Sequence, residues 1–183
     1  MVFPTRGLYG LAVDAFNADA VHRVFRVKGR SPDNPVLILI RHPDDLGELV
    51  TAVPATAARL VKKIWPGGLT LVLPASQAVP TVLTAGTGKI GIRLPAHPVA
   101  RALVEAVGRP VTGTSANLSG QPGCSRIDLL AAEIADVADL IIDAGRLAGG
   151  VGSTVVDVTR QEPVIIRRGA ISDDIIQKAL APD

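Results

Sequence analysis

The sequence predicts an α/β protein built on an open sheet with flanking helices. Strand-like and helix-like patterns alternate along most of the 183 residues, which is typical of layered α/β folds. Several strand-like runs, such as Pro35–Ile40, are apolar on both faces, as strands in a helix-covered sheet usually are. The length suits one domain with its own core, so we expect a single domain over residues 1–183.

Short signals predict where the individual elements begin and end. Asn17 is a suitable N-cap for a helix whose apolar face includes Val21 and reaches Lys28. Pro54 and Pro98 fit the first turns of two further helices. The other expected signals are a helix stop at Gly108, helix caps at Ser125 and Ser172, a strand ending at Pro110-Val111, and strands at Pro35–Ile40, Leu69–Leu73, Ile90–Leu94, Asp139–Ile142, Ser153–Val158 and Val164–Ile166.

The composition excludes several functional classes. Aromatic residues make up 3% of the chain, too few for a surface that stacks successive bases of a single strand. A net charge of +2 permits contact with nucleic acid without requiring it. Cys124 is the only cysteine, so a disulfide framework is excluded and a reducing compartment is expected. No apolar run is long enough for a membrane span and no cleavable signal is visible, so we expect a cytoplasmic protein.

The loop Thr112–Gly120, with the sequence TGTSANLSG, is the most informative segment. It follows the end of an expected strand and concentrates hydroxyl and amide side chains beside two glycines. Side chains of this kind at a strand end are where α/β sheets bind ligands. A plain strand-to-helix turn also favours Ser, Thr and Asn, but five such side chains are more than a turn needs. We therefore predict a ligand-binding loop here.

Cations near other expected strand ends suggest phosphate or carboxylate ligands. Lys28 and Arg30 follow an expected helix, and an arginine fork matches phosphate oxygens; the alternative is a solvated helix C-terminus. Arg93 and Arg167 each end an expected strand, where a guanidinium can hold a carboxylate bidentately. For Arg93 an exposed strand end is equally consistent with the sequence.

Other site chemistries have little support in the sequence. No histidine lies near Ser115, and the G-x-S-x-G context of a hydrolase nucleophile is missing. No spacing of His, Cys, Asp or Glu indicates a dedicated metal site, so we expect any Mg²⁺ to arrive with substrate phosphates. P-loop and Rossmann fingerprints are also missing. A nucleotide would have to use another kind of cradle.

Motifs along nearly the whole chain resemble those of the YrdC-like threonylcarbamoyl-AMP synthase family. They are Pro4-Thr5, Tyr9-Gly10-Leu11, Lys28-Gly29-Arg30, Asn34-Pro35, Ser115–Gly120 (SANLSG), Ser153–Asp157 (STVVD) and Arg167. The resemblance implies a twisted open sheet of mixed strands with a concave basic cleft. It also implies an enzyme, a nucleotidyltransferase that makes threonylcarbamoyl-AMP and pyrophosphate from L-threonine, bicarbonate and ATP for tRNA adenosine-37 modification. Possible partners are then tRNA and the tRNA-modification enzymes.

The resemblance also implies roles for individual residues. Because the reactants combine with each other, catalysis would be mainly positioning and charge stabilisation. By position, the catalytic residues are Lys28, Arg30, Ser115 and Asn117; those at ATP are Arg30, Asn34, Lys89, Ser115, Gly123 and Arg167; and those at threonine are Thr5, Gly7, Leu39, Arg93, Gly113 and Ser153.

The sequence departs from the family pattern mainly at the expected threonine residues. Arg6 and Gly7 stand where the family has an acid and a second threonine, and Leu39 stands where many members have a histidine. The N-terminal helix and strand usual in the family are also missing. We therefore predict that nucleotide binding is kept while threonine binds weakly or is replaced by another amine.

Two alternative functions remain open on the sequence. One is an RNA-binding module that uses the basic cleft without catalysis, supported by the cations of residues 23–30. The other is a related carbamoyl-adenylate chemistry with a different amino-acid substrate.

Overall fold

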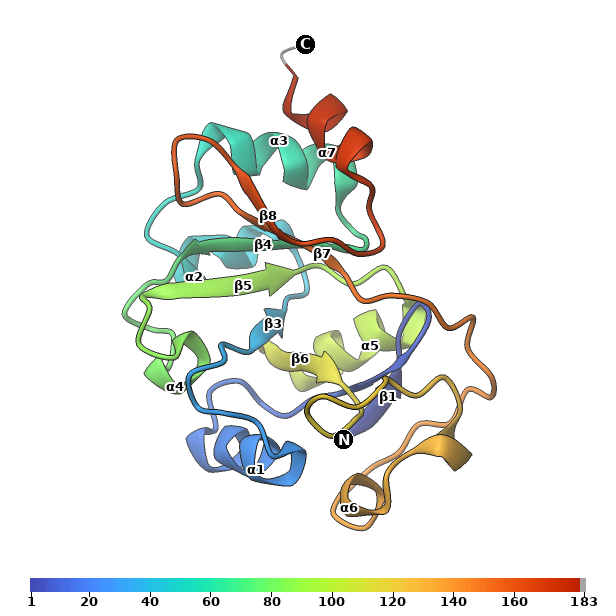
Figure 1. Cartoon of the computed structure of the whole chain (residues 1–183). Coiled ribbons are helices and arrows are strands. Elements are labelled where there is room, and N and C mark those ends of the chain that lie inside the picture. The colour runs from blue at the N-terminus through green and yellow to red at the C-terminus, as the bar shows by residue number, and fades with distance from the viewer. Residues whose placement is uncertain (182–183) are drawn as a thin grey trace.

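A computed structural model describes residues 1–181 and contains one eight-stranded mixed sheet. The strand order is β1-β2-β6-β3-β5-β4-β7-β8 (Figure 1). Parallel pairing joins β3 to β5 and β4 to β7, and the other neighbours are antiparallel. The predicted α/β fold with mixed strands is confirmed, while the single-domain organisation stays a prediction. The strands are β1 (Val2–Pro4), β2 (Tyr9–Leu11), β3 (Leu37–Leu39), β4 (Leu69–Pro74), β5 (Lys89–Arg93), β6 (Val111–Ser115), β7 (Thr154–Asp157) and β8 (Val164–Arg167).

Helices surround this sheet, and α3 lies beside α7 at the top of Figure 1. The 3-10 turns are η1 (Pro43–Asp45) and η2 (Ile127–Leu129). The α-helices are α1 (Ala18–Lys28), α2 (Leu46–Leu49), α3 (Ala55–Ile64), α4 (Thr81–Thr84), α5 (Pro98–Val107), α6 (Ala132–Ala135) and α7 (Asp173–Leu180).

Most of the predicted helix ends are confirmed. The Asn17 side chain accepts a hydrogen bond from the Ala20 N–H, and the Ser172 side chain accepts one from the Ile175 N–H, which satisfies donors that a helix start leaves free. Pro98 is the first residue of α5, and Gly108 ends that helix with a φ of 74°. Such a left-handed conformation suits glycine.

Four sequence predictions are wrong in detail. The strand expected to end at Pro110-Val111 begins at Val111 and runs to Ser115, so the first part of the expected loop Thr112–Gly120 is β6, paired with β2 and β3. Pro54 is the N-cap of α3 and lies just outside its first turn. Ser125 caps no helix, because only the 3-10 turn η2 follows and Arg126 precedes it directly. Residues 139–142 form no strand; the Val2 N–H donates to the Leu140 carbonyl and the Ile142 N–H donates to the Val2 carbonyl. β1 is too short to extend this single bridge into a ladder.

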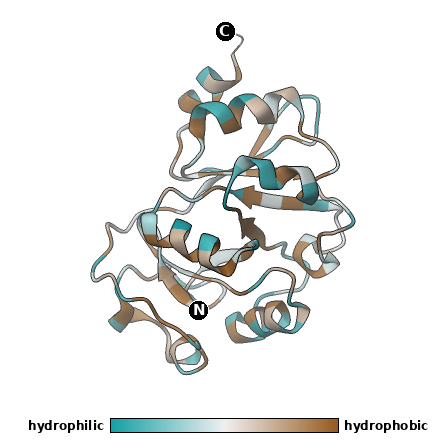
Figure 2. Cartoon of the chain, turned by 180° about the vertical axis from the view of Figure 1, so that it is seen from behind, coloured by the Kyte–Doolittle hydropathy of each residue, from teal (hydrophilic) through white to brown (hydrophobic). Residues whose placement is uncertain are grey.

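The central strands have one apolar face and one open face. Side chains alternate along a strand, and Ile38, Leu71, Ile90, Ile92 and Val156 share one face and are fully buried in the main core. Helices α2, α3 and α7 contribute to this core. In Figure 2 the strands are mostly brown, and the helices mix brown and teal residues. The opposite face of the same strands is hollowed.

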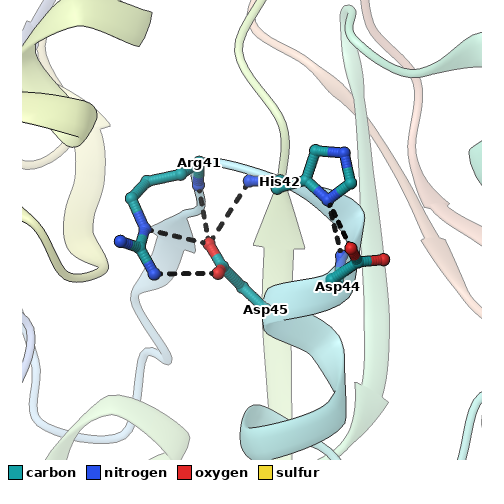
Figure 3. A network of polar contacts seen from close by, with 4 residues as sticks. All are labelled: Arg41, His42, Asp44 and Asp45. Atoms are coloured by element: carbon teal, nitrogen blue, oxygen red, sulfur yellow. Dashed lines mark hydrogen bonds and ion pairs between the residues drawn. The ribbon is translucent and has the colours of Figure 1, made fainter.

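A polar network fixes the chain where it leaves β3. The Asp45 carboxylate accepts hydrogen bonds from the backbone N–H groups of Arg41 and His42 and from the Arg41 guanidinium, while His42 interacts with Asp44 (Figure 3). Burial disfavours the charged carboxylate, but these hydrogen bonds outweigh it and lower the pKa of Asp45. The network thereby anchors the end of β3, which lines the hollow.

Within residues 1–181, the structure has no helix with the length and apolar character of a membrane span.

Candidate functional site

A cavity of about 850 Å³ occupies the open face of the central strands. Its floor consists of alternate residues from four neighbouring strands. They are Leu37 and Leu39 of β3, Lys89, Gly91 and Arg93 of β5, Thr70 and Val72 of β4, and Val155 and Asp157 of β7. The loop after β6 and the segments 5–10 and 151–153 form its walls. Such a volume is in the range of small-molecule sites.

Gly91 and Gly113 leave space above the floor of the cavity because they have no side chain. A Cβ on Gly113 would lie 2.6 Å from Cδ1 of Leu37, and one on Gly91 would lie 3.1 Å from the Leu37 Cβ. A side chain at either position would therefore displace its neighbour or project into the hollow. These glycines let a ligand approach the backbone of the sheet.

One end of the cavity, which we call the Ser115 end, is lined by Arg30, Ser115, Asn117 and Gly123. The Arg30 guanidinium donates from Nε to the Asn34 carbonyl at 3.2 Å and from Nη2 to the Pro35 carbonyl at 2.7 Å. These bonds hold the side chain in place without neutralising its charge. Burial and the nearby Arg167 both lower the pKa of Arg30, and no carboxylate within residues 1–181 pairs with it.

The opposite end, which we call the Arg93 end, is lined by Leu39 and Arg93, which are paired in the neighbouring strands β3 and β5. Nε of Arg93 donates to the Gly67 carbonyl at 2.8 Å. Burial lowers the pKa of Arg93 to about 10, with smaller contributions from the charges of Arg167 and Arg6. Arg93 still carries its charge at neutral pH, and a carboxylate is its natural ligand.

Arg167 lies near both Arg30 and Arg93, because its charge lowers the pKa of each. Its guanidinium donates to the Ser153 carbonyl at 2.9 Å and to the Ser153 hydroxyl at 3.0 Å. Ser153 in turn shares a 2.8 Å hydrogen bond with the Thr70 hydroxyl. Within residues 1–181, none of these three guanidiniums has a carboxylate partner. Three mutually repelling cations around one hollow favour a polyanion.

Asp157 is the one carboxylate lining the cavity within the described part of the chain. Its Oδ2 accepts a hydrogen bond from Lys89 Nζ at 2.9 Å, and its Oδ1 accepts one from the Thr159 hydroxyl at 2.6 Å. Burial opposes the charge of Asp157, but these hydrogen bonds outweigh it and lower its pKa. The pair neutralises itself, so the excess charge of the cavity comes from the arginines.

The loop after β6 presents its side chains to the cavity and its carbonyls to α1. Ser115 and Asn117 line the cavity, whereas their carbonyl oxygens accept hydrogen bonds from Lys28 Nζ. The Asn117 amide donates to the carbonyls of Leu118 and Gln121, and its Oδ1 is buried without a partner. A buried acceptor without a donor is uncommon and is available to a ligand.

Most of the predicted site residues meet in this one cavity, although they come from distant parts of the sequence; their individual roles stay predictions. Lys28, Asn34 and Gly7 do not line it. Lys28 lies behind the loop after β6, Asn34 uses its carbonyl to hold Arg30, and Gly7 packs on Gly149. Those that line the cavity are Thr5, Arg30, Leu39, Lys89, Arg93, Gly113, Ser115, Asn117, Gly123, Ser153 and Arg167.

Among the cavity residues to which the sequence analysis assigned no role are His97 and Asp157. His97 is the N-cap residue of α5 but makes no side-chain capping hydrogen bond, and it lines the cavity with a buried Nδ1 that has no partner within residues 1–181. Its place just before Pro98 in R-L-P-A-H-P could have linked it to Arg93, four positions earlier. Asp157 belonged to the motif Ser153–Asp157 but was assigned no role of its own. Its position at the end of a buried strand could have indicated that it lies in the cavity.

Fold and cavity together define a class: an α/β protein whose open sheet face carries a cationic small-molecule cleft. A family model for the Sua5/YciO/YrdC domain, described as telomere recombination, matches residues 1–169. The chain belongs to this family.

Named relatives support this assignment. The threonylcarbamoyl-AMP synthase of Pyrococcus abyssi (strain GE5 / Orsay) is 41% identical over 180 residues, covering 98% of this chain and 53% of that protein. The threonylcarbamoyl-AMP synthase of Bacillus subtilis (strain 168) is 38% identical over 183 residues, covering 100% of this chain and 53% of that protein. The chain thus spans about half the length of these two relatives.

A solved structure has the same fold. The crystal structure of P. abyssi Sua5 complexed with L-threonine matches with a TM-score of 0.93 at 41% identity, covering 97% of this chain and 52% of that one.

Proposed function

We propose that this chain makes threonylcarbamoyl-AMP and pyrophosphate from L-threonine, bicarbonate and ATP, as a nucleotidyltransferase. The observation that carries the proposal is the convergence of Arg30, Arg93 and Arg167, without carboxylate partners among residues 1–181, on one cavity. The names of the relatives point to the same reaction. They favour it over an RNA-binding module without chemistry.

The proposed reaction needs no nucleophile from the protein. The threonine amine attacks the carbon of bicarbonate, and loss of water leaves a carbamate. A carbamate oxygen then attacks the α-phosphorus of ATP, the bond to the bridging oxygen breaks, and pyrophosphate leaves with the electron pair. Negative charge grows on the phosphate oxygens, where fixed cations stabilise it most effectively. Arg30 and Arg167, which both line the cavity, would serve that task.

The Arg93 end would take the amino acid. Arg93 would bind the threonine carboxylate, and Ser153 and the backbone at Gly113 would lie beside the carbamate. Leu39 offers no hydrogen bond, the Thr5 hydroxyl already donates to the Leu8 carbonyl at 2.5 Å, and Gly7 has no side chain. This composition supports the prediction that threonine binds more weakly than ATP.

Mg²⁺ would enter with the ATP phosphates. Among the described residues, no group of three His, Cys, Asp or Glu side chains could hold a metal ion, and Asp157 is already paired with Lys89. Delivery of the product to tRNA, alone or with tRNA-modification enzymes, and a cytoplasmic location complete the proposal.

Mass detection of threonylcarbamoyl-AMP after incubation with the three substrates tests this proposal. We expect the adenylate and pyrophosphate in equal amounts, and neither product when bicarbonate or threonine is left out. ATP binding without any adenylate would contradict the synthase. Product formation with another amine but not with threonine would instead favour a related carbamoyl-adenylate chemistry. An RNA-binding module would bind tRNA in a strongly salt-dependent manner and form no adenylate.

A further inference from the structure

Lys28 holds the loop after β6 from behind. It is the last residue of α1 and only 2% exposed. Its Nζ donates to the carbonyl oxygens of Ser115 and Asn117 at 2.5 Å each, and its own carbonyl accepts the Ser119 N–H at 2.8 Å. The side chain and backbone of one residue thus grip three positions of the loop.

The hydrogen bonds from Lys28 Nζ to the loop come from an ammonium group that has no counter-ion among the described residues. Within residues 1–181 no carboxylate pairs with Lys28. Burial and, to a smaller extent, the charge of the nearby Arg30 lower the pKa of Lys28 to about 8. The other titratable group facing it is the Cys124 thiol, whose own pKa is raised by burial. An unpaired buried ammonium is costly, so an apolar side chain would serve mere packing better.

The hydrogen bonds of Lys28 also determine which groups of the loop after β6 face the cavity. Ser115 and Asn117 line the cavity but Lys28 does not, so the two carbonyl oxygens bound to Nζ are turned toward α1. If these carbonyls turned into the cavity, their negative ends would repel an anion. The ammonium also adds positive charge directly behind the loop, in a region of low dielectric where charge acts strongly.

We propose that Lys28 is a positioning residue of the anion site: its charged ammonium turns the Ser115 and Asn117 carbonyls away from the cavity and thereby supports binding and turnover of ATP. This inference rests on the proposed function for its substrate and goes beyond it in assigning Lys28 a role without substrate contact.

The first test compares Lys28→Met with Arg26→Met, a matched loss of one cation from the exposed face of the same helix. Titration calorimetry with ATP–Mg²⁺ at pH 7 should show affinity reduced by about tenfold or more in Lys28→Met and unchanged in Arg26→Met. The kcat of adenylate formation should fall as well, and Lys28→Arg should recover part of both losses. Equal ATP affinity and kcat in the two Met variants would overturn the proposal.

The pH dependence separates positioning from packing. In the wild type and in Arg26→Met, ATP affinity should fall as the pH rises through about 8. In Lys28→Met it should be low and flat, and in Lys28→Arg it should be flat over the same range. A fall of equal size in Lys28→Met would also overturn the proposal.

A measurement without ATP keeps the inference independent of the proposed function and of how the variants fold. The amide resonances of residues 115–119 in the wild type should shift together with a midpoint near pH 8, while those of α3 should not. If these resonances do not titrate in this way, the proposed role of Lys28 is overturned. Failure of the wild type to bind ATP, with the titration present, would contradict the synthase and restrict Lys28 to ordering the loop.

Discussion

At the Ser115 end of the cleft several polar groups are oriented by the protein yet left free for a ligand, whereas the Arg93 end offers few such groups. Arg30 is held only by backbone carbonyls, and Oδ1 of Asn117 has no partner within residues 1–181. At the other end, Leu39 has nothing to donate, and Arg93 is held by one bond to the Gly67 carbonyl. Arg93 is the single strong group there.

This difference indicates where the binding energy comes from. Cations held in place by carbonyls need little reorganisation when a phosphate arrives, which is the main source of electrostatic stabilisation in active sites. An end with one guanidinium can orient a carboxylate but can select only weakly among amino-acid side chains. In the proposed reaction, the Ser115 end would therefore provide affinity and the Arg93 end would provide orientation.

The largest effect is expected for Arg167→Ala, because the charge of Arg167 acts on both Arg30 and Arg93. Loss of its charge should lower kcat/KM for pyrophosphate release by about 100-fold to 1,000-fold and should raise KM for both ATP and threonine. Arg160→Ala is the matched control, since Arg160 is an exposed cation in the turn between β7 and β8. A change in KM for one substrate only would assign Arg167 to one end and break the comparison.

The buried charge behind the Ser115 end should be visible in stability. The pKa of Lys28 is about 8 in the folded chain against an ordinary value of 10.5, so the unfolded chain binds more protons between these values. Stability of the wild type relative to Lys28→Met should therefore rise from pH 8 to pH 10.5, by about 3 kcal/mol.

Urea denaturation of both proteins at several pH values measures this difference. A constant difference across that range would mean that the ammonium of Lys28 is not desolvated in the folded protein.

Arg93→Ala should separate the two ends. Removal of one charge-assisted contact to a carboxylate should raise KM for threonine by about 10-fold to 100-fold and leave ATP affinity within about twofold. Steady-state kinetics with each substrate varied, together with ATP calorimetry, measures both. Equal loss for ATP and threonine would show that the cleft acts as one electrostatic unit.

The sequence predicted the fold and much of the candidate site because those features depend on local signals. Asn17 and Gly108 end helices through contacts within a few residues, and Arg93 and Arg167 could be placed at strand ends. The helical period also put Lys28 on the same face as Val21 and Phe25, both buried. Its partners could not be predicted, because Ser115 lies 87 positions further along the chain and depends on the sheet topology.

Other features depended on contacts that a single sequence does not contain. Asp139–Ile142 has the composition of a strand, but its only partner is the end of the short β1. His97 lines the cavity because α5 turns it there, and Gly7 is defined by Gly149, which is distant in sequence. Each is a tertiary contact that overrides local pattern.

The smallest effect is expected for Gly7→Ala, and it concerns the rim that Gly7 and Gly149 form beside the cavity. A Cβ at Gly7 would lie 2.0 Å from the Gly149 carbonyl oxygen. The two segments are also joined by a hydrogen bond of 2.8 Å from the Gly149 N–H to the Gly7 carbonyl. Because the obstacle is backbone, the two segments must separate, and we expect a loss of about 1–3 kcal/mol in the free energy of unfolding. Gly47→Ala, in helix α2 with no atom within 4 Å of the added Cβ, should be neutral or slightly stabilising. Denaturant unfolding of both variants measures the contrast. If Gly7→Ala matched Gly47→Ala, the rim would be loose enough to accept the threonine that the family has at position 7, and the weak threonine binding expected at the Arg93 end would need another cause.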